Sequence, residues 1–144
     1  MILDYSKSYI KKILKEVTTI AVVGASAKKE KDSFKVMQSL IENDYRVFPV
    51  NPNEEGNLIL GQRCYKDLSS INETIDMVDI FRTSDAIMGI TKQSIEIKAK
   101  VLWTQLGIIN AEAADLAEKA GLKVVMDRCP KKELSKSYWT PKTK

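Results

Sequence analysis

Residues 18–33 read TTIAVVGASAKKEKDS, and the organisation of the chain can be worked out from this segment. An apolar run at residues 20–23 predicts a buried strand that ends in three small residues, Gly24, Ala25 and Ser26. A lysine-rich loop follows, and a helical pattern begins at residues 32–33. Such a corner is suited to binding phosphate, because small residues let a ligand approach and the first helical N–H groups are unpaired. A tight turn without a ligand has the same sequence signature, so the rest of the chain must distinguish the two.

Composition limits the class of protein. The chain has 144 residues, enough for one domain with a sizeable core. It has no histidine, which excludes histidine metal sites, phosphohistidine chemistry and Ser–His or Cys–His nucleophile pairs. The two cysteines, Cys64 and Cys129, fit no metal-ligand spacing, and we expect free thiols and no metal. No apolar stretch approaches the ~20 residues that span a bilayer, and the N-terminus lacks a secretory signal, so we expect a cytoplasmic protein without a membrane partner.

Apolar runs alternate with helical patterns along the chain. Strands are expected at residues 19–24, 46–50, 77–81, 100–104 and 122–126, and helices at residues 8–17, 33–43, 84–98 and 110–120. Asp32 or Ser33 is expected to cap the second helix and Asn110 the last one, which should end at Ala120 with Gly121 as its C-terminal glycine. This alternation predicts an α/β fold: a single Rossmann-like domain with a five-stranded parallel sheet and helices on both faces. We expect residues 54–74 to be irregular and the basic segment after Pro130 to be loosely held.

The expected strand order is 3-2-1-4-5, with the five strands numbered along the chain. Ligands bind such a sheet at the carboxyl ends of its strands, where the order reverses, here between strands one and four. The residues expected there are Gly24, Ala25, Ser26, Asn51, Pro52, Phe81, Arg82 and residues 103–110. Lys28 and Lys31 in the loop, and Ser33 at the helix start, should face the same phosphates.

The end of the second strand, at Asn51 and Pro52, discriminates among phosphate ligands. NAD-binding proteins usually have Asp or Glu at this place to hold the ribose hydroxyls, whereas Glu54 and Glu55 come only after the proline. The glycine pattern after Gly24 is also incomplete. A nucleotide with a phosphate on its ribose fits this site better, which leaves NADP and coenzyme A (CoA) as candidates.

Five motifs in a fixed order then point to one family. They are VVGAS at residues 22–26, VFPVNP at 47–52, VDIFR at 78–82, VLWTQLGIIN at 101–110 and VVMDRC at 124–129. In this order the chain resembles the small stand-alone CoA-binding proteins, and through them the CoA-binding domain of the succinyl-CoA ligase α subunit, over residues 10–134. The resemblance implies a Rossmann-like domain whose ligand is coenzyme A.

The resemblance also implies roles for individual residues. Gly24, Ala25 and Ser26 would lie at the phosphates, Asn51 and Pro52 beside the adenosine, Phe81 and Arg82 at the rim, and Gln105 and Asn110 on the far side. Simpler roles stay open: Arg82 can pair with a surface carboxylate, Gln105 can be a loop polar group, and Asn110 can be a helix cap.

Three further residues near the end of the last strand have alternatives of their own. We expect Trp103 in the core and Asp127 paired with Arg128. We expect Cys129 to be a packed thiol, with a mixed disulfide to the CoA thiol as the alternative.

We therefore predict a CoA-binding Rossmann-like domain over residues 1–134 and a basic C-terminal tail over residues 135–144. The predicted function is binding of CoA or an acyl-CoA without catalysis, because a nucleophile–base pair and a substrate domain are not evident. An NAD(P)-binding oxidoreductase and a nucleotide-sensing regulatory module that docks on a protein partner are the alternatives. Without a helix-turn-helix pattern, no nucleic-acid partner is expected.

Overall fold

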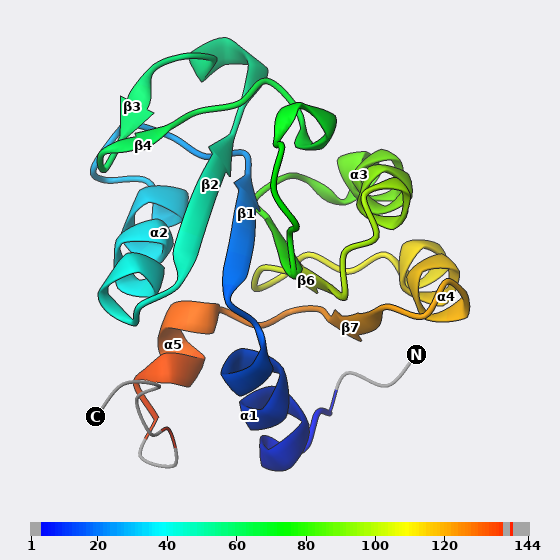
Figure 1. Cartoon of the computed structure of the whole chain (residues 1–144). Coiled ribbons are helices and arrows are strands. Elements are labelled where there is room, and N and C mark those ends of the chain that lie inside the picture. Colours follow the sequence, from blue (N-terminus) through cyan, green and yellow to red (C-terminus); the bar gives the residue numbers. More distant parts are fainter. Residues whose placement is uncertain (1–3, 137–138, 140–144) are drawn as a thin grey trace.

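The fold is built on a five-stranded parallel sheet, seen in a computed structural model that describes residues 4–136 and 139 (Figure 1). The strands are β1 (Thr19–Val23), β2 (Arg46–Val50), β5 (Met77–Ile80), β6 (Val101–Thr104) and β7 (Lys123–Val125), in the spatial order β2-β1-β5-β6-β7. All four neighbouring pairs are parallel. The predicted class, with one parallel sheet covered by helices, is confirmed.

The predicted order of the strands is wrong in one respect. The third long strand, β5, lies between β1 and β6 and not outside β2, which gives 2-1-3-4-5 in the numbering of the prediction. Outside β2 lies a small hairpin of β3 (Leu58–Ile59) and β4 (Gln62–Arg63), and Tyr65 makes a single parallel bridge to Val50. Residues 58–65, which were expected to be irregular, occupy the place that the prediction gave to β5.

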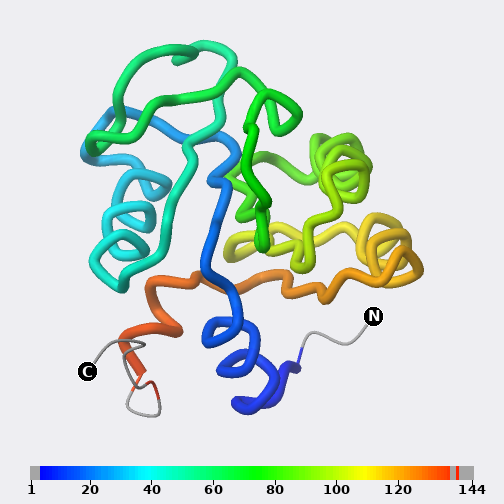
Figure 2. Tube along the Cα trace, in the orientation of Figure 1, coloured from blue at the N-terminus to red at the C-terminus, as the bar shows by residue number. Residues whose placement is uncertain are grey.

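Helices cover both faces of the sheet. On one side lie α1 (Lys7–Glu16), α2 (Asp32–Glu42) and α5 (Pro130–Leu134); on the other lie α3 (Ser84–Glu96) and α4 (Ala111–Lys119) (Figures 1 and 2). Two short 3-10 turns, η1 (Pro52–Glu54) and η2 (Leu68–Ser70), follow β2 and the hairpin. Among the described residues, no helix combines the length and the apolar character needed to cross a membrane.

Side chains of the central strand β1 alternate between two cores. Ile20 and Val22 pack with α1 and α2, whereas Ala21 and Val23 pack with the residues of the α3 and α4 side. All four are buried, because in a sheet covered on both faces successive side chains each meet a layer of helices. This burial on both faces explains why the strands appear in the sequence as continuous apolar runs.

The outer edge of β7 is closed by tyrosines from the N-terminal segment. The Tyr9 hydroxyl donates to the Val124 carbonyl at 3.0 Å and accepts from the Val124 N–H at 3.2 Å. The Tyr5 hydroxyl accepts from the Met126 N–H at 2.9 Å. Edge strands with unpaired backbone groups promote aggregation, and these side chains satisfy those groups at two positions of the edge.

The segment after Pro130 is more ordered than predicted. Pro130–Leu134 form α5, which packs against α2, and Pro130, Glu133 and Leu134 are buried. Lys136 contacts both carboxylate oxygens of Glu133, at 2.9 and 3.0 Å. The difference arises because Leu134 supplies an apolar anchor to the core on the α2 side. Of the predicted tail, residues 137–138 and 140–144 lie outside the described residues.

Candidate functional site

In the turn between β1 and α2, Gly24 lies against the Phe81 backbone, which follows the neighbouring strand β5. Gly24 has φ +87°, and a Cβ placed on it would lie 3.1 Å from the carbonyl carbon of Phe81 and closer still to its oxygen. Only glycine fits such a position without strain. The order of the strands reverses between β1 and β5, so this turn lies at the switch point of the sheet. The prediction had placed the reversal between β1 and the fourth long strand, β6.

Backbone groups of the turn are largely occupied within the protein. The N–H groups of Gly24 and Ala25 both donate to the Val50 carbonyl, at 2.9 and 3.2 Å. The Asn51 side chain donates to the Ala25 carbonyl at 2.8 Å and accepts from the Asn53 N–H at 2.9 Å. Asn51 therefore ties the end of β2 to the turn after β1, and it shapes the site through the backbone.

One pocket lies at this switch point on the side of α3, and we call it the α3-side pocket. It has a volume of about 490 Å³ and is lined by the ends of β1, β2 and β5, by residues 66–68 and by two residues of α3. Its charged lining residues are Lys66, Asp67 and Arg82. Among the described residues, no carboxylate lies within ion-pair distance of Arg82, so its guanidinium can serve a ligand.

Asp67 is the carboxylate of the α3-side pocket. One of its oxygens accepts hydrogen bonds from the Ser70 N–H at 3.0 Å and from the hydroxyls of Ser69 and Ser70. The hydrogen bond from the Ser70 hydroxyl is the main cause that keeps the pKa of Asp67 below its ordinary value. The carboxylate is thus held in its charged form, with one oxygen committed to capping η2.

A second pocket lies on the opposite face of the sheet, and we call it the α2-side pocket. It has a volume of about 360 Å³ and lies between α2, α5 and the loop after β6. Its lining residues are Asp32, Lys35, Val36, Phe81, Gln105, Leu106, Cys129, Lys131, Lys132 and Ser135. Phe81, which follows β5, lines both pockets, so the two cavities lie on either side of this residue.

A buried carboxyl holds Gln105, one of the residues that line the α2-side pocket. Asp79 in β5 is 0% exposed, and its Oδ1 accepts a hydrogen bond of 2.7 Å from the Gln105 amide nitrogen. Its Oδ2 has no hydrogen-bond partner among the described residues. Burial raises the pKa of Asp79 to about 8, against the lowering effect of the Gln105 hydrogen bond. This side chain therefore holds a proton at neutral pH and orients Gln105.

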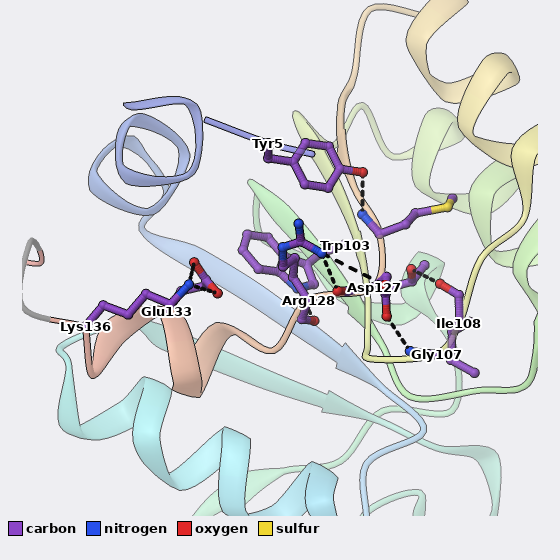
Figure 3. A network of polar contacts seen from close by, with 10 residues as sticks. Tyr5, Trp103, Gly107, Ile108, Asp127, Arg128, Glu133 and Lys136 are labelled. Atoms are coloured by element: carbon purple, nitrogen blue, oxygen red, sulfur yellow. Dashed lines mark hydrogen bonds and ion pairs between the residues drawn. The ribbon is translucent and has the colours of Figure 1, made fainter. Parts of the chain in front are cut away.

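The C-terminal end of β7 carries a polar network beside the core (Figure 3). The Trp103 indole is fully buried and donates to the Arg128 carbonyl at 2.9 Å, as its predicted place in the core requires. Arg128 lies 3.9 Å from the Asp127 carboxylate, which confirms the predicted pair. Asp127 also accepts from the Gly107 N–H at 2.6 Å. The network fixes the loops after β6 and β7, and with them the backbone that leads to Cys129.

Comparison with known proteins identifies the family. The family model described as "CoA binding domain" matches residues 18–135, which include the whole sheet and both pockets. The chain belongs to this CoA-binding domain family.

Relatives of this CoA-binding domain cover most of its length. YneT of Bacillus subtilis (strain 168), described as an uncharacterized protein, is 36% identical over 126 residues, which are 88% of this chain and 92% of YneT. The solved structure of a hypothetical protein from Pyrococcus horikoshii OT3 matches with a TM-score of 0.86 and 40% identity over 92% of each chain. An ADP-forming acetate–CoA ligase of Methanocaldococcus jannaschii is 26% identical over 76 residues, 53% of this chain and 10% of the ligase. These matches confirm the resemblance seen in the sequence.

The structure brings some of the predicted site residues together and leaves others apart. Gly24, Asn51, Pro52, Phe81 and Arg82 line the α3-side pocket, and Phe81 and Gln105 line the α2-side pocket. The lining of these pockets does not include Ala25, Ser26, Lys28, Lys31, Ser33 or Asn110. Asn110 instead caps α4, accepting from the Ala113 N–H at 3.0 Å, as the simpler interpretation expected.

The start of α2 differs from its prediction. The N-cap is Lys31 and not Asp32 or Ser33, and the Lys31 side chain makes no capping hydrogen bond. Lys28 and Lys31 are exposed, whereas Ser33 is buried. The uncapped N–H groups of the first turn lie beside the α2-side pocket, since Asp32 and Lys35 line it.

Sequence reasoning missed two groups of residues that the CoA-binding domain places in its pockets. Lys66 and Asp67 reach the α3-side pocket because the chain folds back after the hairpin. Lys131 and Lys132 reach the α2-side pocket because α5 packs on α2. The available signals were local ones: an Asp-Leu-Ser-Ser cap at residues 67–70 and a proline at the first position of α5.

Proposed function

We propose that this chain binds coenzyme A, free or acylated, at the carboxyl ends of β1, β2 and β5, and that it binds without catalysing a reaction. The observation that carries the proposal is the match of residues 18–135 to the CoA-binding domain. It is supported by the basic pocket at the switch point of the sheet, the place where parallel α/β sheets bind nucleotides.

The α3-side pocket suits the nucleotide half of CoA. That half carries a diphosphate and a phosphate on its ribose, and Lys66 and Arg82 supply two positive charges against the single carboxylate of Asp67. Arginine binds phosphate through two parallel hydrogen bonds, and lysine through a point charge. We assign Arg82 and Lys66 to the phosphates, with Pro52 and Asn53 beside the adenosine.

The proposal of binding without catalysis rests on side-chain chemistry. The sequence has no histidine, and the described residues contain no group of three or more Cys, Asp or Glu placed to hold a metal ion. Histidine pairs and metal-activated water, two common ways to activate a nucleophile, are therefore not supplied by these side chains. We also assign the protein to the cytoplasm, with a nucleotide-like small molecule as its partner.

Calorimetric titration of the wild-type chain with CoA, NAD, NADP and ATP tests the proposal. CoA should bind most tightly, and Arg82→Ala should weaken its binding by about 1–3 kcal/mol, roughly 5- to 150-fold, because a charged hydrogen bond to phosphate is lost. Lys66→Ala should act in the same direction. Lys92→Ala is the matched control, since Lys92 is an exposed lysine of α3 that does not line the pocket.

Failure of the wild-type chain to bind CoA would contradict the proposal. So would Arg82→Ala and Lys66→Ala variants that bind CoA as tightly as the wild type and the Lys92→Ala control do. A CoA affinity that does not fall with rising salt would also contradict it, because phosphate contacts to exposed lysine and arginine are screened over ~8–10 Å.

A second candidate is an NAD(P)-binding protein, and Asp67 is the observation that favours it. A carboxylate in the pocket can hold ribose hydroxyls, the role that the end of β2 does not fill. If this candidate is correct, NAD should bind more tightly than CoA in the same titrations, and Asp67→Asn should weaken NAD and leave CoA unchanged.

A further inference from the structure

The α2-side pocket and the α3-side pocket lie on either side of Phe81, at the end of β5. The two cavities lie on opposite faces of the sheet and share Phe81. A ligand anchored by its phosphates at Arg82 can therefore extend past Phe81 toward α2 and α5. CoA has the right chemistry for such a path, because a flexible arm with two amide groups and a terminal thiol follows its nucleotide.

The lining of the α2-side pocket matches an arm of this kind. Val36, Phe81 and Leu106 provide apolar surface, and Leu106 is 50% exposed, so part of this surface is open to a ligand. Gln105 supplies an amide that can pair with an amide of the arm. Asp79 points toward the α2 side under this pocket and leaves its Oδ2 buried and without a partner among the described residues. Asp79 reaches the pocket through Gln105, which lines it, and a buried oxygen left without a partner in a native fold calls for an explanation.

Cys129 is the thiol of this pocket. It is half-buried, lines the cavity and precedes α5, and its side chain makes no capping hydrogen bond to that helix. The other cysteine, Cys64, is fully buried, and burial raises the pKa of its thiol. The chain therefore contains one thiol within reach of a ligand in the α2-side pocket and one thiol that serves as its internal control.

We propose that the α2-side pocket receives the thiol-bearing arm of CoA and that Cys129 exchanges with the disulfide form of that ligand, an inference that rests on the proposed function. The Cys129 thiol loses its proton to solvent, and the thiolate attacks one sulfur of a CoA disulfide. The S–S bond of the ligand breaks as a bond forms between Cys129 and the attacked sulfur. The second CoA leaves as a thiolate and takes up a proton. Cys129 is oxidised and the ligand disulfide is reduced, so no other oxidant is needed.

Through this exchange, the chain records the oxidation of the CoA pool as a mixed disulfide on Cys129. Binding brings the two sulfurs together, and such an intramolecular step is faster than a collision between free molecules. Excess reduced thiol reverses the reaction, because exchange runs through the same mixed disulfide in both directions.

Exchange rates followed by intact-protein mass spectrometry test the proposal. The wild type, Cys64→Ser and Cys129→Ser are each treated with CoA disulfide and, separately, with glutathione disulfide. We expect one CoA adduct on the wild type and on Cys64→Ser, and none on Cys129→Ser. The adduct from CoA disulfide should form at least about tenfold faster than the adduct from glutathione disulfide, because only CoA is held in the site. The nucleotide fragment 3′-phosphoadenosine 5′-diphosphate should slow the first reaction and not the second.

Each other outcome overturns the inference in a recognisable way. Equal rates with the two disulfides, or no protection by the nucleotide fragment, would make Cys129 an ordinary exposed thiol. An adduct on Cys64 would place the arm elsewhere. The absence of any adduct, with CoA still bound in calorimetry, would overturn the role of Cys129 and leave the proposed function intact. If calorimetry detects no CoA binding, the proposed function fails first and the inference fails with it.

Discussion

Substitution of Gly24 tests the close approach of β1 and β5 at the site. Gly24→Ala has two costs that can be separated. The positive φ of +87° is strained for alanine by about 1–2 kcal/mol. The new methyl group also meets the Phe81 backbone, and the required shift of packed atoms costs about 1–3 kcal/mol more. We therefore expect a loss of about 2–5 kcal/mol in the free energy of unfolding.

Two other glycines calibrate this value. Gly56 has φ +83°, and a Cβ placed on it would have nothing within 4 Å, so Gly56→Ala should show the strain alone. Gly89 lies within α3, also with open space around it, so Gly89→Ala should stabilise by about 0.5–1 kcal/mol through the lower entropy of the unfolded chain. The series thus separates strain, collision and helix propensity with the same chemical change.

Thermal unfolding followed by circular dichroism measures all three variants. For a domain of this size each kcal/mol shifts the melting temperature by roughly 2–4 °C, so Gly24→Ala should melt roughly 4–20 °C below the wild type. Gly56→Ala should lose roughly 2–8 °C by the same conversion. If Gly24→Ala were no less stable than Gly56→Ala, the approach of β1 to the Phe81 carbonyl would not constrain this turn, and the geometry of the site would need to be redrawn.

Three further predictions concern the buried acid, the sheet edge and the ligand. The free energy of unfolding should fall as pH rises from 3.8 to about 8, because Asp79 keeps its proton in the folded chain and loses it on unfolding; urea titrations should show this slope, and Asp79→Asn should flatten it. Tyr9→Phe removes both hydrogen bonds to Val124 and should cost about 1–2 kcal/mol in urea unfolding, whereas Tyr65→Phe, whose hydroxyl makes no hydrogen bond within the described residues, should be nearly neutral. CoA at 100 times its Kd should raise the melting temperature by roughly 5–11 °C, and NAD at the same concentration should change it little; a larger shift with NAD would contradict the CoA assignment.

The strands were predictable because burial on both faces leaves a clear signal. The predicted limits 19–24, 46–50, 77–81, 100–104 and 122–126 agree with the observed strands to within one residue at every end. Their order was not predictable in the same way, because β3 and β4 have two residues each, which is too short for periodicity to detect. With the hairpin missed, β5 was placed outside β2, where Tyr65 bridges to Val50.

The site was predictable only where it follows directly from the strands. Gly24, Asn51 and Phe81 come at the ends of apolar runs, so parallel strands bring them to the same edge of the sheet. Lys66 and Lys131 belong to segments whose positions depend on packing over long distances in the sequence, and their local patterns do not reveal which face they reach. Lys28 and Lys31 are exposed and outside the lining of both pockets, so their predicted contact with the phosphates stays a prediction.

The order of the strands is also what brings Arg82 close to Gly24. Neighbouring strands lie about 4.8 Å apart, so in the predicted order β5 would lie roughly 10 Å from β1, with β2 between them. In the observed order β5 pairs directly with β1, and the Arg82 side chain comes within 3.2 Å of a Cβ placed on Gly24. The predicted association of Gly24 with Arg82 was correct although the predicted order would have separated them. It came from placing both residues at the carboxyl ends of parallel strands, a rule that holds for either order, and the family motifs pointed the same way.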